Sequence, residues 1–212
     1  MPRRTDTGIG LSGHASVVAP LLLGSTITSR VEGRTVSVRL TEVEAYGGVG
    51  EDPGSHAFRR QTPRNTTMFG PPGRAYVYFT YGMHHCLNVV VGPDGTAGAV
   101  LLRAGEVVDG IATARERRIG ARDRDLARGP GRLTVALGVT IDLDGADLWA
   151  ARSPLQLTRA DPVSAAAIVV TARTGVAGPG APTPWRFALR DEPTVSPYRA
   201  AVPRRASGRM PG

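Results

Sequence analysis

Alternation of apolar and polar residues predicts a β-sheet in the central part of this chain. Residues 34–46 have a period of two, which is typical of a strand with one buried face. Two further strand-like runs, Ala75–Thr80 and His84–Val91, meet at Tyr81-Gly82-Met83, which predicts a β-hairpin with Gly82 in the turn. Shorter apolar runs predict three more strands, at residues 99–103, 166–176 and 185–190.

Helical spacing and loop composition complete the predicted fold. Helices are predicted at residues 17–24, 107–118 and 132–137, whereas residues 47–74 lack periodicity and predict a long ordered loop. The sequence has no internal repeat and no linker long enough to separate two domains. We therefore expect an α+β fold, a single domain over residues 14–199 with a central curved antiparallel sheet, a protruding β-hairpin and flanking helices. A loose arm (1–13) and a disordered tail (200–212) are expected on either side.

Composition narrows the possible functions. The 212 residues are 41% hydrophobic, which suffices for one packed domain. All 26 basic residues are arginine, so any mechanism that needs a lysine amine, such as a lysine Schiff base, is excluded. The net charge of +8 favours a polyanionic partner, with nucleic acid ahead of a membrane surface.

Cysteine and histidine usage argues against a metal or cofactor. The single cysteine, Cys86, excludes an internal disulfide, a multi-cysteine zinc site and an iron–sulfur cluster. His84 and His85 are adjacent in a predicted strand and point to opposite faces, so they cannot easily chelate one ion. The apolar run at residues 17–23 is short and contains Pro20, which argues against a membrane span. We expect a soluble cytoplasmic protein, associated with the nucleoid if it is bacterial, that binds no membrane and needs no cofactor.

Glu42 and Glu44 form an unusual pair within the predicted strand at residues 34–46. They are two residues apart, so they share one face of that strand with Tyr46. The simpler interpretation is a solvent-exposed face that carries a pair of charges. The alternative is a general base beside an aromatic platform.

Aromatic residues gather in the predicted hairpin. Aromatics make up only 5% of the chain, yet a short stretch holds Tyr76, Tyr78, Phe79 and Tyr81. Ordinary sheet packing could account for them, because tyrosine is a good strand former. Nearby arginines instead favour a surface for unstacked bases, which combines cations with stacking rings. The arginines expected to contact phosphates are Arg59, Arg60, Arg64 and Arg74.

A series of short motifs, in order along the chain, resembles one enzyme family. The motifs are Thr41-Glu-Val-Glu-Ala-Tyr46, Ser55-His-Ala, Gln61-Thr-Pro-Arg-Asn65, Met68-Phe-Gly-Pro-Pro-Gly73, Tyr76-Val-Tyr-Phe-Thr-Tyr-Gly-Met83, Leu87-Asn88 and Leu101-Leu-Arg-Ala104. Together they resemble the 3-methyladenine DNA glycosylases of the alkyladenine (methylpurine) type. The match is dense over residues 38–105 and thinner in residues 129–133, 173–176 and 186–189.

The resemblance implies a monofunctional DNA glycosylase. Such an enzyme flips alkylated or deaminated purines out of duplex DNA, hydrolyses the N-glycosidic bond and leaves an abasic site. Glu44 matches the general base that activates the attacking water, and Arg103 matches an arginine that helps to hold this water. A monomer acting on double-stranded DNA is the expected state.

The resemblance also implies roles for residues around the base. The residues that match the stacking walls of the base pocket are Tyr46, His56 and Tyr78. Asn88 matches a residue that crowds the exocyclic amino group of guanine. Tyr81 matches a wedge that fills the gap in the duplex, and Met83 lies beside it at the tip of the hairpin.

Other functional classes fit the sequence less well. A damage-binding module that flips a base without cutting would keep the tyrosines and arginines, but it needs no poised carboxylate. A formamidopyrimidine-type glycosylase would use Pro2 as an N-terminal amine, but Arg3 stands where those enzymes place an acidic residue, and the zinc-finger cysteines are missing. A tRNA-modifying enzyme would share the positive charge, but no motif supports it.

Overall fold

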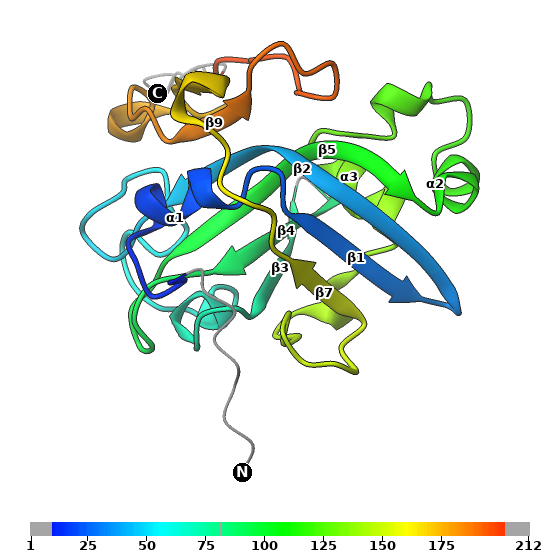
Figure 1. The fold of residues 1–212 in the computed structure, drawn as a ribbon. Coiled ribbons are helices and arrows are strands. Elements are labelled where there is room, and N and C mark those ends of the chain that lie inside the picture. The colour runs from blue at the N-terminus through cyan, green and yellow to red at the C-terminus, as the bar shows by residue number, and fades with distance from the viewer. Residues whose placement is uncertain (1–9, 81, 202–212) are drawn as a thin grey trace, which may run out of the picture.

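One antiparallel sheet organises the chain in the computed structural model, which describes residues 10–80 and 82–201 (Figure 1). Its main path runs β3-β4-β5-β2-β1-β7, with β6 beside β5 and β9 joining β8 to β2. Every pairing is antiparallel. The strands are β1 (Thr26–Val31), β2 (Arg34–Tyr46), β3 (Ala75–Thr80), β4 (His84–Val90), β5 (Ala99–Asp109), β6 (Ala127–Arg128), β7 (Leu155–Thr158), β8 (Ile168–Thr171) and β9 (Arg186–Leu189).

Strand β2 lies at the centre of this sheet. It pairs with β5 over residues 37–46, while β1 pairs with its first half and β9 with residues 42–44. The β2–β5 register shifts on both sides of Glu42, which marks a bulge. Residues 41–45 are all buried, so both faces of the sheet are covered there. Any charged side chain in this part of β2 therefore lies in the protein interior.

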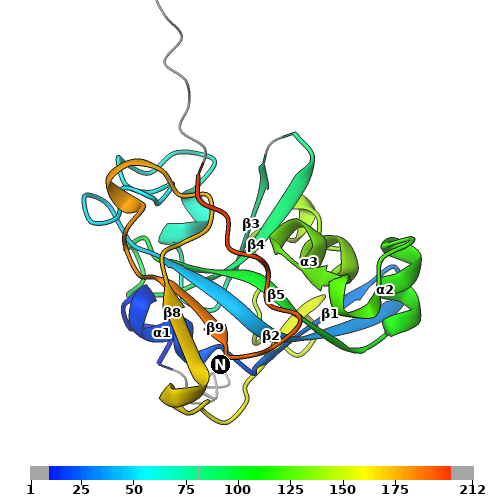
Figure 2. The ribbon, with the colours of Figure 1, turned by 90° about the horizontal axis from the view of Figure 1, so that it is seen from above.

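Within the described part of the chain, three α-helices flank the sheet, namely α1 (Ala15–Leu21), α2 (Ile111–Arg117) and α3 (Pro130–Leu137). Helices α2 and α3 lie side by side, and α3 packs against β4 (Figure 1). The β3–β4 hairpin extends beyond the rest of the sheet (Figure 2). Short 3-10 turns occupy Thr66–Phe69, Asp123–Asp125, Ile141–Leu143, Ala165–Ala167 and Gly178–Gly180. None of the helices in the described residues is long and apolar enough to cross a membrane.

The structure confirms the α+β class and the antiparallel sheet, and β2 and β3 have the predicted bounds. The helix predicted at residues 107–118 is partly wrong, because β5 continues to Asp109 and α2 begins at Ile111. The cause is Gly110, which has a φ of 71° and lies so close to Thr35 that a Cβ would stand 2.1 Å from its carbonyl oxygen. The strand predicted at 166–176 is confined to Ile168–Thr171. Strands β1, β6 and β7 were not predicted.

The two ends of the chain are described only in part. Leu11, within the segment expected to be a loose arm, is buried in the core, and its carbonyl accepts a hydrogen bond from the N–H of Gly92. Residues 1–9, Tyr81 and residues 202–212 lie outside the described residues. The expectations for the disordered tail and for the Tyr81 wedge fall there.

Candidate active site

Glu42 and Glu44 are both fully buried, so the expectation of a solvent-exposed charge pair is wrong. Burial of β2 on both faces removes these carboxylates from water, and a buried charge needs a partner. Arg103, on the neighbouring strand β5, supplies one to each. Its Nε donates to Glu42 at 2.9 Å and its Nη1 donates to Glu44 at 3.3 Å. The two glutamates therefore share one buried guanidinium.

Both carboxylate oxygens of Glu42 accept hydrogen bonds from other parts of the protein. Besides Arg103, it accepts hydrogen bonds from Arg186 Nε at 2.6 Å, from the Ser196 N–H at 2.7 Å and from the Ser196 hydroxyl at 3.0 Å. These donors come from β9 and from the segment that follows it. Glu42 thus fastens the C-terminal part of the chain to the centre of the sheet.

Glu44 has a different set of partners. Its Oε1 accepts the Thr174 N–H at 2.7 Å, and its Oε2 accepts the Tyr46 hydroxyl at 3.0 Å as well as Arg103. Burial raises the pKa of Glu44, and Arg103, Thr174 and Tyr46 offset this only in part. The side chains or backbone of all three partners line the main cavity, so Glu44 lies directly behind its wall.

The main cavity has a volume of about 730 Å³ and is lined by aromatic groups. On one wall the His56 ring meets the Tyr78 ring edge to face, with ring centroids 4.6 Å apart. Tyr76 lies beside Tyr78 at 5.3 Å between centroids, and its hydroxyl is 3.3 Å from His56 Nδ1. Tyr46 belongs to the same lining. Burial and the charge of Arg64 lower the pKa of His56, so the imidazole is neutral at pH 7.

Asn88 lies in the same cavity, on β4 opposite Tyr76. Its side chain is 3% exposed, and its Nδ2 donates to the Tyr76 carbonyl at 2.9 Å across the hairpin. The predicted pocket residues Tyr46, His56, Tyr78 and Asn88 are therefore brought together around one hollow. The predicted catalytic pair, Glu44 and Arg103, lies at its wall.

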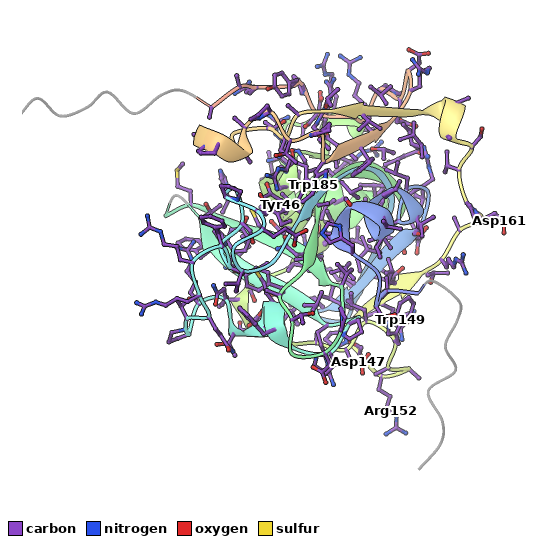
Figure 3. The ribbon with its side chains drawn as sticks, turned by 90° about the vertical axis from the view of Figure 1, so that its left-hand side faces the viewer. Tyr46, Asp147, Trp149, Arg152, Asp161 and Trp185 are labelled. Carbon is purple, nitrogen blue, oxygen red and sulfur yellow. The ribbon has the colours of Figure 1, made fainter. Side chains whose placement is uncertain are left out.

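The predicted phosphate-contacting arginines do not form one group. Arg59, Arg60 and Arg64 are exposed in the loop before β3, and Arg64 lies over the Tyr78 ring at 5.8 Å. Arg74 precedes β3 at the end away from the hairpin tip and pairs with Asp147 at 3.8 Å. Figure 3 shows Asp147 far from Tyr46, so Arg74 lies apart from the cavity.

At the hairpin tip, Met83 is 71% exposed, which suits a side chain that contacts a partner.

Comparisons with known proteins identify the family of this chain. The family profile described as "Methylpurine-DNA glycosylase (MPG)" matches residues 11–193. The chain belongs to this family.

Similar proteins of the methylpurine-DNA glycosylase family occur in several bacteria, and each carries the name "Putative 3-methyladenine DNA glycosylase". The protein of Streptomyces avermitilis is 54% identical over 190 residues, which cover 89% of each chain. That of Nocardia farcinica is 53% identical, with 90% of this chain and 91% of the relative covered. That of Carboxydothermus hydrogenoformans is 44% identical, with 85% and 92% covered.

Several residues around the candidate site are absent from the sequence predictions. Thr174 and Ser196 act through contacts that lie far away in sequence, which no local pattern could reveal. Arg118 and Arg132 line the cavity, as does Gly129-Pro130-Gly131 at the start of α3. Pro130 at the first position of a helix was a readable signal for this helix start. Among the described residues, no group of three or more His, Cys, Asp or Glu could hold a metal ion.

Proposed function

We propose that this protein excises alkylated or deaminated purines from duplex DNA by hydrolysing their N-glycosidic bond. The observation that carries the proposal is Glu44, a buried carboxylate held by Arg103 and Thr174 directly behind an aromatic cavity. Glu42, by contrast, accepts four hydrogen bonds from Arg103, Arg186 and Ser196, which suits a structural acid. The proposal concerns duplex DNA as substrate and an abasic site as product.

The cavity suits a purine that has been flipped out of the helix. Extrusion costs a few kcal/mol, and stacking on aromatic side chains supplies roughly 1–3 kcal/mol per base. Tyr46, His56 and Tyr78 offer such surfaces. A purine alkylated at N3 or N7 is cationic, so electron-rich ring faces attract it more than a neutral base. A neutral His56 adds no repelling charge of its own to this wall.

The chemistry needs one proton acceptor and one water molecule. The C1′–N bond breaks with its electron pair leaving on the base, and the sugar acquires oxocarbenium character. The oxygen of the water bonds to C1′ while Glu44 accepts the proton of that water. Arg103 orients the carboxylate, and the negative charge of Glu44 stabilises the developing positive charge on the sugar. We expect the reaction to stop at an abasic site, since the chain has no lysine to form a Schiff base.

Phosphate contacts hold the duplex at the mouth of the cavity. Arg59, Arg60 and Arg64 lie on one side of the hairpin. Arg118 and Arg132 line the cavity together with the start of α3, and the N-terminus of a helix favours an anion. The positive charge of Arg132 contributes, after burial, to a lowered pKa of Arg118, as expected for two cations that face the same space. A phosphate between them would relieve this repulsion.

Single-turnover excision tests the proposal. Duplexes with one 3-methyladenine, 7-methylguanine, hypoxanthine or ethenoadenine are incubated with excess protein, and abasic sites are revealed by alkali. We expect excision of at least one lesion, with strand cleavage only after alkali. Lesion binding without any abasic product would instead support a damage-binding module, and cleavage before alkali would contradict the monofunctional mechanism.

A further inference from the structure

Arg173 is a fully buried cation beside the cavity that the proposed mechanism does not use. Its side chain is 0% exposed, and its Nη1 and Nη2 donate to the two carboxylate oxygens of Asp52 at 2.6 and 2.7 Å. The same two nitrogens reach the carbonyl oxygens of Ala45 at 2.9 Å and of Gly180 at 3.3 Å. Burial alone would raise the pKa of Asp52, but Arg173 together with the N–H groups of Gly47 and Gly54 outweighs burial and lowers this pKa, so the pair is ionised.

The guanidinium of Arg173 also contacts two aromatic rings. Its central carbon lies 4.7 Å from the centroid of the Tyr46 ring and 5.4 Å from that of the Trp185 ring. Figure 3 shows Tyr46 and Trp185 close together in the middle of the molecule. Tyr46 lines the cavity, so Arg173 supports this stacking wall from the protein interior.

Two loops that line the cavity meet at Arg173. Asp52 belongs to the first loop and directly precedes Pro53 and Gly54, both of which line the cavity. The second loop follows β8 and contains Arg173, and the next residue, Thr174, donates its N–H to Glu44. The junction has no spare space, because a Cβ on Gly54 would stand 2.6 Å from Arg173 Nη2.

We infer that Arg173 is a positioning residue, which fixes the Tyr46 ring and the Thr174 N–H and thereby the general base Glu44. This inference rests on the proposed function. A buried ion pair is weak evidence for a role in stability, because well-packed apolar side chains can often replace one without loss of stability. A guanidinium, by contrast, can bind one carboxylate through two nitrogens and stack on a ring, which fixes direction as well as distance.

Loss of the contacts of Arg173 should shift the pH dependence of excision in one direction. The Thr174 N–H stabilises the ionised form of Glu44, so loosening it should raise the pKa of this carboxyl group. Arg173→Lys keeps the positive charge but cannot form the two-point contact. Asp52→Asn removes a negative charge, which by Coulomb interaction alone would lower the pKa of Glu44. A rise in both variants therefore reports lost positioning rather than changed charge.

The experiment is the single-turnover excision rate as a function of pH, with thermal unfolding measured in parallel. Wild type is compared with Arg173→Lys, Asp52→Asn and a control, Arg117→Lys. Arg117 is a mostly buried arginine between α2 and α3, and its Nη1 donates to the Ala136 carbonyl at 3.1 Å. The acid limb is the part of the pH–rate profile in which the rate rises as Glu44 loses its proton. We expect both test variants to shift the midpoint of this limb upward by about one pH unit, the effect of one lost hydrogen bond to a charged group. The control should lower the melting temperature and leave the limb in place.

The other possible results separate failure of the inference from failure of the proposed function. An acid limb at the wild-type position in folded Arg173→Lys or Asp52→Asn overturns the inference, as does an equal shift in the control. If Arg173→Lys does not fold, Asp52→Asn decides alone. A wild-type protein that excises no lesion overturns the proposed function itself, which keeps the two failures distinct.

Discussion

Substitution of each buried glutamate by glutamine tests whether Glu44 is catalytic and Glu42 structural. Glu44→Gln preserves the shape of the side chain but removes the proton acceptor. We expect the single-turnover rate to fall by about two to four orders of magnitude, the usual contribution of a general base. That loss corresponds to roughly 3–5 kcal/mol of transition-state stabilisation. Binding to lesion-containing DNA should stay near wild type, because stacking and phosphate contacts are unchanged.

The effects on stability should have the opposite order. Glu42 accepts hydrogen bonds from Arg103, Arg186 and both donors of Ser196, so Glu42→Gln leaves two guanidinium groups short of negative charge. Breaking a buried ion pair costs about 3–5 kcal/mol. For a chain of this length, each kcal/mol lowers the melting temperature by roughly 2–4 °C.

Glu44→Gln should change stability far less. Burial raises the pKa of Glu44, so its ionised form is unfavourable in the folded protein at neutral pH, and a neutral amide relieves this. The amide group leaves one buried donor without an acceptor, which costs about 1–3 kcal/mol and offsets the relief. Excision rates and denaturant unfolding of both variants provide the test. A slower chemical step in folded Glu42→Gln than in Glu44→Gln, or equal losses of stability, would refute the assignment of the base.

Four further predictions concern the titration of Glu44, the base pocket and the contacts with DNA. Excision by wild type should rise with pH around a midpoint above the ordinary carboxyl range, since only ionised Glu44 accepts a proton. Asn88→Ser should raise excision of undamaged guanine relative to hypoxanthine by making room for the 2-amino group, and competition between the two duplexes measures this ratio. Arg64→Ala and Arg132→Ala should each weaken binding to DNA of any sequence. Each should also reduce the slope of log affinity against log salt concentration by about one, and an unchanged slope would exclude a phosphate contact. Tyr81→Ala should slow excision of a paired lesion more than of a mismatched one, whereas equal losses would contradict the wedge.

Much of the sheet could be predicted because its central strands keep a regular pattern. The period-two run over residues 34–46 and the aromatic run at residues 75–80 predict the bounds that β2 and β3 have in the structure. Strand β1 could not be predicted, because its two buried residues are Ile27 and Ser29. One of them is polar, so apolar and polar residues do not alternate along this strand. The Ser29 hydroxyl is satisfied by donating to the carbonyl of Leu137, a contact that the local sequence does not reveal.

The candidate site was predictable to the extent that its residues lie in contiguous motifs. Glu44, Arg103 and Asn88 belong to strands whose motifs resemble the family, and the structure brings them to one cavity. The contacts that hold them come from elsewhere, since Thr174 and Ser196 follow their glutamate partners by more than a hundred residues. The antiparallel pairing of β9 with β2 carries these segments to the site. Such supporting residues are defined by the fold rather than by local sequence.

The distribution of buried charge distinguishes the acids of this site from one another. Glu42 and Asp52 each bind a guanidinium at short range, and their hydrogen bonds link segments that are distant in sequence. Glu44 shares Arg103 with Glu42 and holds it at the longer of the two distances. Its other donors, the Tyr46 hydroxyl and the Thr174 N–H, are neutral. Because neutral donors compensate a buried charge less fully than a guanidinium does, Glu44 is the acid best able to accept a proton at the cavity wall.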